Sequence, residues 1–138
     1  MNSGSGMSGA QQYKMLSLDS EVYSASPHRL IQLLMEGILS RINAAKICID
    51  NSNIAGKGES ISTAISIING LQVSLDKEAG GEISENLNNL YDYMARRLLE
   101  ANIKSDKKIL EEVASLLMEI KSAWDAIAPE LEANHETG

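Results

Sequence analysis

The sequence predicts an all-α protein, an antiparallel up-down four-helix bundle with an additional short N-terminal segment or helix packed on it. Apolar residues make up 43 % of the chain, whereas aromatic residues make up only 4 % and Phe is absent. The remaining aliphatic residues favour helices over sheets. Pro27 and Pro129 are the only prolines, which leaves about a hundred residues between them without this helix breaker. Within that interval, four segments repeat their apolar residues every 3.6 positions, as amphipathic helices do.

The first predicted helix begins at Ser26-Pro27 and ends near Asn51. Serine caps the free backbone N–H groups of a helix start, and proline fits the first helical turn. The apolar stripe of this helix is Leu30, Leu34, Ile38, Ile42, Ala45 and Ile49. We expect the glycine-flanked segment Gly56-Lys57-Gly58 to be a turn that separates it from the second helix.

The second predicted helix ends at Gly80-Gly81, since glycine is typical of helix C-termini. Its stripe is Ile61, Ala64, Ile65, Ile68, Leu71 and Leu75. Gly70 lies inside this helix at a cost of about 1 kcal/mol relative to alanine. Close approach of a neighbouring helix is the favoured reason for this glycine, and a kink is the alternative.

The third and fourth helices are separated near Ser105, where the periodic pattern restarts, and Pro129 ends the last one. The third stripe is Ile83, Leu87, Leu90, Tyr91, Met94, Leu98 and Ala101. The fourth stripe is Ile109, Val113, Leu116, Ile120, Ala123 and Ile127. Four helices of about 20 to 25 residues with short connections favour an antiparallel bundle.

The two ends of the chain are expected to lie outside the bundle domain, which we place at residues 10–129. Residues 1–9 are interpreted as a flexible leader that an expression vector can contribute. Residues 130–138 lack apolar periodicity and are expected to be disordered. Residues 11–24 are too apolar for a solvated tail, so we expect them to lie against the bundle.

Charge and cysteine content exclude several classes of partner. The net charge is -7 and the sequence pI is about 4.8, so the chain repels nucleic-acid backbones and anionic lipid. The one cysteine, Cys48, has no partner for an internal disulfide, which fits a reducing compartment. Neither a bilayer-spanning run nor a signal-peptide pattern is present. The predicted location is the cytoplasm, without membrane insertion.

Residues that carry catalytic or metal chemistry are sparse. Di-iron bundles need two Glu-x-x-His pairs, and the sequence has one, Glu132 with His135, beyond the predicted bundle. Cys48 lies at the end of an apolar stripe and is expected to be a buried, inert thiol. Glu82, Glu85, Asp92 and Glu100 lie among polar residues and are interpreted as a solvated helix face. We therefore expect no enzyme activity, no cofactor and no metal.

A cluster of basic residues stands out in this acidic chain. It contains five of the twelve Lys and Arg residues, namely Arg96, Arg97, Lys104, Lys107 and Lys108. Either these side chains form a solvated corner, or they contact an acidic partner.

Several stretches together resemble a known family. The most distinctive stretch is Leu90-Tyr91-Asp92-Tyr93-Met94, followed by Arg96-Arg97-Leu98-Leu99-Glu100-Ala101-Asn102-Ile103. Before it stands Gly80-Gly81-Glu82-Ile83, and after it stand Glu111-Glu112-Val113 and Ala123-Trp124. Ser24-Ala25-Ser26-Pro27-His28-Arg29-Leu30-Ile31 stands near the start. In this register, the chain from about Tyr13 to Pro129 resembles the flagellin-specific export chaperone family, FliS.

The resemblance implies a cytoplasmic helical bundle that binds the disordered C-terminal segment of flagellin. Such a chaperone masks that segment against premature polymerisation and helps deliver the subunit to the export gate of the flagellar secretion apparatus. Grooves between helices suit this task, because an amphipathic segment can place its apolar face in them. We also expect some self-association as a homodimer when the client is absent, since an empty apolar groove is an exposed patch.

The resemblance places Tyr13 at or beside the flagellin-binding groove. Leu16, Leu18 and Tyr23 join it as candidates from their apolar character, although packing onto their own bundle would explain the same residues. Arg96 and Arg97 lie off the apolar stripe and are candidate contacts for client or export gate. Trp124 either packs along the bundle edge or anchors a client, whereas Tyr91, Met94 and Leu98 are expected in the core.

Two other functions remain as alternatives to the chaperone. One is a structural helical-bundle protein that self-associates through exposed apolar grooves and has no flagellin client. The other is an enzyme or metal carrier built on a bundle, which the sparse chemistry above disfavours.

Overall fold

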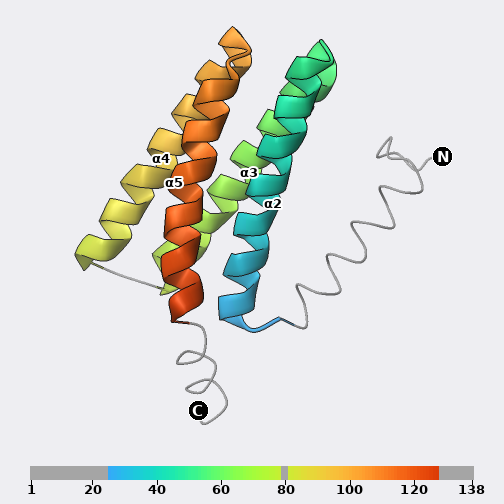
Figure 1. Ribbon diagram of the computed structural model, residues 1–138. Helices are drawn as coiled ribbons and strands as arrows, with labels where there is room; N and C mark the ends of the chain where they lie inside the picture. The colour runs from blue at the N-terminus through green and yellow to red at the C-terminus, as the bar shows by residue number, and fades with distance from the viewer. Residues whose placement is uncertain (1–24, 79–80, 128–138) are drawn as a thin grey trace, which may run out of the picture.

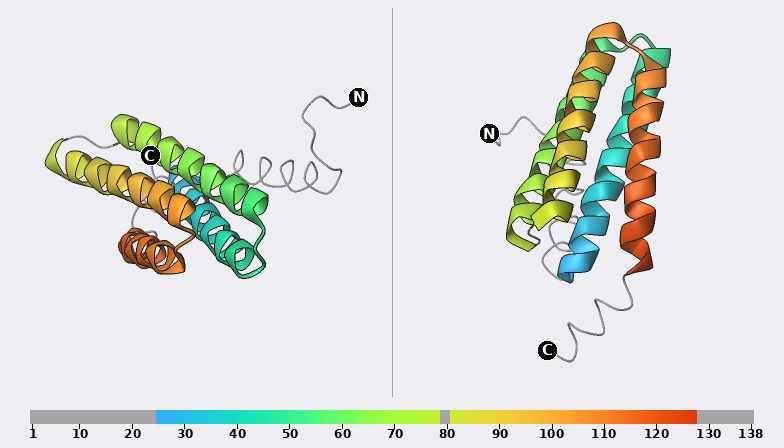
Figure 2. Two further views of the ribbon diagram at one scale, coloured as in Figure 1. Left: turned by 90° about the horizontal axis from the view of Figure 1, so that it is seen from above. Right: turned by 90° about the vertical axis from the view of Figure 1, so that its left-hand side faces the viewer.

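The computed structural model describes residues 25–78 and 81–127, and these form four α-helices (Figure 1). The helices are α2 (Pro27–Asp50), α3 (Ile54–Glu78), α4 (Gly81–Lys104) and α5 (Lys107–Ala126). Each helix packs against two neighbours, α2 against α3 and α5, and α4 against the same two helices (Figure 2). The prediction of an all-α four-helix bundle is confirmed.

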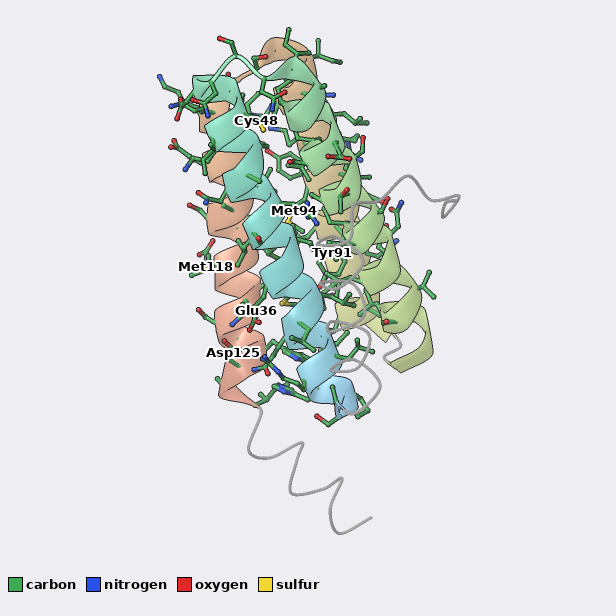
Figure 3. The ribbon with its side chains drawn as sticks, turned by 90° about the vertical axis from the view of Figure 1, so that its right-hand side faces the viewer. Glu36, Cys48, Tyr91, Met94, Met118 and Asp125 are labelled. Carbon is green, nitrogen blue, oxygen red and sulfur yellow. The ribbon has the colours of Figure 1, made fainter. Side chains whose placement is uncertain are left out.

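The two ends of the bundle differ in what they contain. The α2–α3 turn and the α4–α5 turn lie together at one end, which we call the apical end (Figure 1). The start of α2 and the end of α5 lie side by side at the opposite, basal end. Figure 3 shows the same division, with Cys48 toward the apical end and Asp125 toward the basal end.

Local capping chemistry explains where α2 begins. Ser26 has an extended backbone, and its Oγ accepts the N–H of Arg29 at 3.1 Å. Pro27 occupies the first turn, where its missing N–H leaves no hydrogen bond unmade. The predicted start at Ser26-Pro27 is therefore confirmed.

The turn after α2 lies at Asn51–Asn53, and the predicted turn at Gly56-Lys57-Gly58 is wrong. Ser52 takes the left-handed conformation with φ 57°, and Asn53 Oδ1 accepts the N–H of Gly56 at 3.0 Å, capping α3. Residues 56–58 lie in the first turns of α3. A Cβ at Gly56 would lie 2.8 Å from Cys48 Sγ and 2.6 Å from Asn53 Nδ2, so this glycine permits close packing inside the helix.

Two other glycines differ from expectation. Gly81 takes φ +78° at the first residue of α4, so it begins the third helix instead of ending the second. Gly70 lies in the interior of α3, but a Cβ there would meet nothing within 4 Å. The expected close approach of a neighbouring helix at Gly70 is therefore wrong.

The α4–α5 turn falls where the pattern restarts. Ser105 has φ 50°, and Asp106 then caps α5 by accepting the N–H of Lys108 at 2.9 Å. This short connection, like the one at Asn51–Asn53, makes consecutive helices antiparallel.

The core receives four buried apolar residues from each helix. They are Met35, Ile38, Ile42 and Ala45; Ile61, Ala64, Ile68 and Leu71; Tyr91, Met94, Leu98 and Ala101; and Ile109, Leu110, Val113 and Leu117. Figure 3 shows Tyr91 and Met94 in the interior of the bundle. Their predicted core positions, and that of Leu98, are confirmed.

Candidate protein-binding surface

The surface between α4 and α5 is closed in its apical half by a chain of polar contacts. The Tyr93 hydroxyl donates to Glu112 at 2.6 Å, and the Arg97 guanidinium donates to Glu112 at 2.9 Å and to Glu100 at 2.5 Å. Lys104 donates to the other oxygen of Glu100 at 2.7 Å. We call these five residues the α4–α5 ion network.

The ion network changes the pKa values of its members. The hydrogen bonds from Tyr93 and Arg97 lower the pKa of Glu112, and those from Lys104 and Arg97 lower the pKa of Glu100. The contact with Glu112 raises the pKa of Tyr93 and of Arg97. All of these groups face solvent, so salt screens their attraction and each pair contributes little to stability.

Toward the basal end, α4 and α5 diverge (Figures 1 and 2), and the side chains of their apolar stripes become more exposed. Along α4, Met94 is fully buried, Leu90 and Leu87 are half-buried, and Ile83 is 72 % exposed. Along α5, Val113 is fully buried, Leu116 and Ile120 are half-buried, Ala123 is exposed, and Ile127 is 39 % exposed.

These residues face one another across the two helices. Arg97 of α4 contacts Glu112 of α5. Because the two helices are antiparallel and have the same rise per residue, counting backward along α4 and forward along α5 from this contact gives residues at the same level. The same register brings Leu90, Leu87 and Ile83 opposite the α5 segment 116–127. We call this set, which is half-buried near the ion network and exposed toward the basal end, the basal seam; its residues are Ile83, Leu87, Leu90, Leu116, Ile120, Ala123 and Ile127.

The basal seam shows that the predicted apolar stripes are not buried along their whole length. All seven residues belong to those stripes, but Ile83, Ala123 and Ile127 are exposed. The spacing identified an apolar face correctly, but the angle between α4 and α5 decides whether that face is covered. An amphipathic helix laid between α4 and α5 would cover it in the way that the bundle covers its own core.

Of the predicted site residues, Tyr13, Leu16, Leu18 and Tyr23 lie outside the described residues. Of the other three, Arg96 and Arg97 are neighbours in the apical half of α4, whereas Trp124 lies at the basal end. Arg96 is exposed on α4, and Arg97 beside it belongs to the ion network.

Trp124 lies at the basal end, where it joins the first and last described helices. Its ring stacks on the buried ring of His28 with centroids 4.7 Å apart and planes 8° from parallel. Two hydrogen bonds between a side chain and a backbone carbonyl flank the stack. Trp124 Nε1 donates to the His28 carbonyl at 3.0 Å, and His28 Nε2 lies 2.8 Å from the Trp124 carbonyl. We call this pair the basal clamp.

At the apical end, Lys57 is almost fully buried. Its Nζ donates to the Asn102 carbonyl at 2.8 Å and to Ser105 Oγ at 2.6 Å, so an α3 side chain supports the end of α4. Cys48, expected to be buried, is only half-buried. With Lys57 and Ser105, it lines a shallow cavity of about 260 Å³.

Sequence reasoning missed a second group of exposed apolar side chains. Ile54, Leu99 and Ile103 are each more than half exposed. A signal was available, because Leu99 and Ile103 are apolar residues that stand off the buried stripe of Leu98 and Ala101. The basic residues of the same stretch were interpreted, but its exposed apolar residues were not.

A metal site and a membrane span would each leave a recognisable feature in the described part of the chain. There, no group of three or more His, Cys, Asp or Glu side chains is arranged to hold a metal ion. No helix of residues 25–78 and 81–127 has both the length and the apolarity needed to cross a bilayer.

A four-helix bundle whose apolar stripes become exposed toward one end has a surface suited to binding another protein. The chain belongs to the FliS family of flagellar proteins, because the family described as "Flagellar protein FliS" matches residues 9–131. The resemblance found in the sequence is thereby confirmed.

Curated relatives carry the same family name. The flagellar secretion chaperone FliS of Salmonella typhimurium is 48 % identical over 123 residues, which cover 88 % of this chain and 91 % of the relative. FliSB of Pseudomonas aeruginosa, also a flagellar secretion chaperone, is 48 % identical over 122 residues, covering 88 % and 97 %. FliS of Bacillus subtilis is 35 % identical over 120 residues, covering 86 % and 89 %.

Proposed function

We propose that this protein is a flagellar secretion chaperone that binds the disordered C-terminal segment of flagellin in the bacterial cytosol. It prevents premature polymerisation of that segment and assists delivery of the subunit to the flagellar export gate. Membership of the FliS family and the names of the curated relatives support the chaperone role, which is not a class of enzyme.

The basal seam is the observation that carries the client-binding part of this proposal. A disordered segment that folds on binding must bury enough apolar surface to offset the entropy of ordering. The seam offers apolar side chains at helical spacing on two helices, with exposure that rises from the ion network to Ile83. An amphipathic client helix would complete the core between α4 and α5.

Other residues extend the proposed contact. Tyr13 is proposed to lie at or beside the client groove, with Leu16, Leu18 and Tyr23 in the same segment. Arg96 and Arg97 remain proposed contacts for either the client or the export gate, and Trp124 for the client. Among those that the structure describes, Trp124 is next in sequence to the seam residue Ala123 and three residues before Ile127, the C-cap of α5.

Calorimetric titration with a peptide from the C-terminal region of the organism's own flagellin tests the proposal. We expect one-to-one binding with a negative heat-capacity change, the signature of apolar burial. Ile83→Ser and Ile127→Ser should each weaken binding about tenfold, equivalent to about 1.4 kcal/mol. Both side chains are exposed, so the variants should fold normally.

Matched controls separate the parts of the proposal. Val73→Ser removes an apolar side chain that is 57 % exposed on α3, and it should bind the peptide like the parent. A Tyr13→Ala variant tests the N-terminal segment. Absence of binding by the folded protein would reject the flagellin client. If self-association also persists when the peptide is added, the structural self-associating alternative is favoured. Equal binding by the seam variants would reject the seam alone.

A further inference from the structure

Three of the most exposed large apolar side chains gather at the apical end. Ile103 is 84 % exposed, Ile54 75 % and Leu99 54 %. Leu99 and Ile103 are one helical turn apart and share the outer face of α4, since Leu98 and Ala101 point into the core. An apolar face of this kind on a charged chain indicates a contact surface.

Ile54 belongs to the same region because Lys57 ties the start of α3 to the end of α4. Its Nζ bonds the Asn102 carbonyl and Ser105 Oγ, and Ile54 precedes Lys57 by one turn. Ile54 and Ser105 line the cavity of about 260 Å³ beside this contact. The apical patch, as we call it, consists of Ile54, Leu99, Ile103 and Arg96.

The charge beside this apolar face is positive. Arg96 lies one turn before Leu99 and is exposed, and Lys108 is exposed at the start of α5; within the described residues, neither has an ion-pair partner. The nearby carboxylates already accept hydrogen bonds from other groups of the bundle. Glu100 binds Arg97 and Lys104, Asp106 caps α5, and Asp92 accepts from Gln72. Free cations in a chain of net charge -7 complement an acidic ligand.

A second copy of this chain fits the patch less well. A stable dimer interface buries about 800 Å² and about 20 residues on each side, whereas this patch offers three large apolar side chains. A two-fold dimer would also set the patch against itself and bring the two Arg96 residues close together. A narrow ligand with its own negative charges suits the surface better.

We propose that the apical patch docks an acidic amphipathic helix of a partner protein, with its apolar side chains on Ile54, Leu99 and Ile103 and a carboxylate on Arg96. This site is separate from the basal seam, because Leu99 and Ile103 lie on the outer face of α4, whereas the seam lies between α4 and α5 nearer the basal end. The bundle therefore holds a client at one end and a second protein at the other, and the inference does not depend on the identity of the client.

The test uses the isotope-labelled full chain and a stapled helical peptide with leucines on one face and glutamates beside them. Two control peptides replace the glutamates by lysines or the leucines by serines. In NMR titrations, we expect the acidic amphipathic peptide to shift amides of residues 54–58 and 96–108, and both controls to bind at least about tenfold more weakly. Added salt should weaken the acidic peptide's binding.

Variants locate the contact. Ile103→Ser should weaken binding about tenfold. Arg96→Glu should weaken binding and also reduce its salt dependence. Val73→Ser should change neither the affinity nor its salt dependence. Shifts confined to residues 83–90 and 116–127, equal binding of the lysine peptide, or no binding would overturn the proposal. A dimer that dissociates in Ile103→Ser during sedimentation would also overturn it, by assigning the patch to a second copy.

Discussion

Lys57 illustrates how one side chain replaces a helix cap. The last carbonyls of a helix have no partner within the helix, and the Asn102 carbonyl is bonded by the Lys57 ammonium from α3. Sequence reasoning assigned Lys57 to a turn, because its two glycine neighbours are typical of turns. The glycines are instead tolerated inside α3, where Asn53 caps the helix three residues earlier.

Replacing Lys57 with methionine should lower the free energy of unfolding by about 1–3 kcal/mol, because the Asn102 carbonyl and Ser105 hydroxyl lose their donor. Urea unfolding followed by circular dichroism measures this change. The control is Lys108→Met, an exposed lysine at the same end of the bundle, which should stay within about 0.5 kcal/mol of the parent. Equal stability of both variants would contradict a stabilising role for the buried ammonium.

Between elements, the α4–α5 ion network predicts a dependence on pH. The folded-state pKa of Glu112 and of Glu100 lies below the ordinary value of 4.5. A lowered pKa stabilises the fold above the unfolded-state pKa, and this contribution disappears as the pH falls through the folded-state value. The contribution is therefore present at pH 7 and lost in acid.

The Glu112→Gln variant should accordingly be less stable than the parent at pH 7, and the difference should shrink as the pH falls below about 4. Urea midpoints at several pH values measure it, and high salt should reduce the difference at pH 7. Glu119→Gln is the control, because within the described residues this exposed carboxylate makes no ion pair. A difference that persists unchanged in acid would contradict the network's role.

The helices themselves could be predicted well where their signals are local. Ser26-Pro27 carries its own capping chemistry, and Ser105 marks the restart of a pattern, so both boundaries were right. The exposure of Ile83 and Ile127 could not be predicted, because it depends on the angle between α4 and α5. The same holds for Leu99 and Ile103, whose apolar character was visible but whose exposure at the same end of the bundle as Ile54 depends on the fold. The flagellin groove at Tyr13 stays a prediction.

For the whole molecule, the basal clamp is one of the contacts that join α2 to α5 and close the ring of helices. His28 and Trp124 are 96 positions apart in sequence, so their contact forms only when the bundle is assembled. No local pattern could have predicted the pair, although Trp124 was expected either to pack along the bundle edge or to anchor a client.

Trp124→Ala should lower the free energy of unfolding by about 2–3 kcal/mol, because it removes the stack and the indole hydrogen bond. His28→Ala should have a similar effect, and the double variant should cost less than the sum of the two. Urea unfolding by circular dichroism measures all three. Met118→Ala, a side chain 52 % exposed on α5 (Figure 3), should change stability by about 0.5 kcal/mol or less. Strict additivity would show that the rings do not act together.

The side-by-side position of the start of α2 and the end of α5 also sets the response of the bundle to mechanical force. Traction on these two points acts across the helix axes, since both points lie at the basal end. The load falls first on the clamp and then peels α5 from α2 turn by turn, instead of shearing whole helices past one another. Few contacts break at each step, so this domain yields to pulling from its ends at low force, although it resists spontaneous unfolding through its whole core.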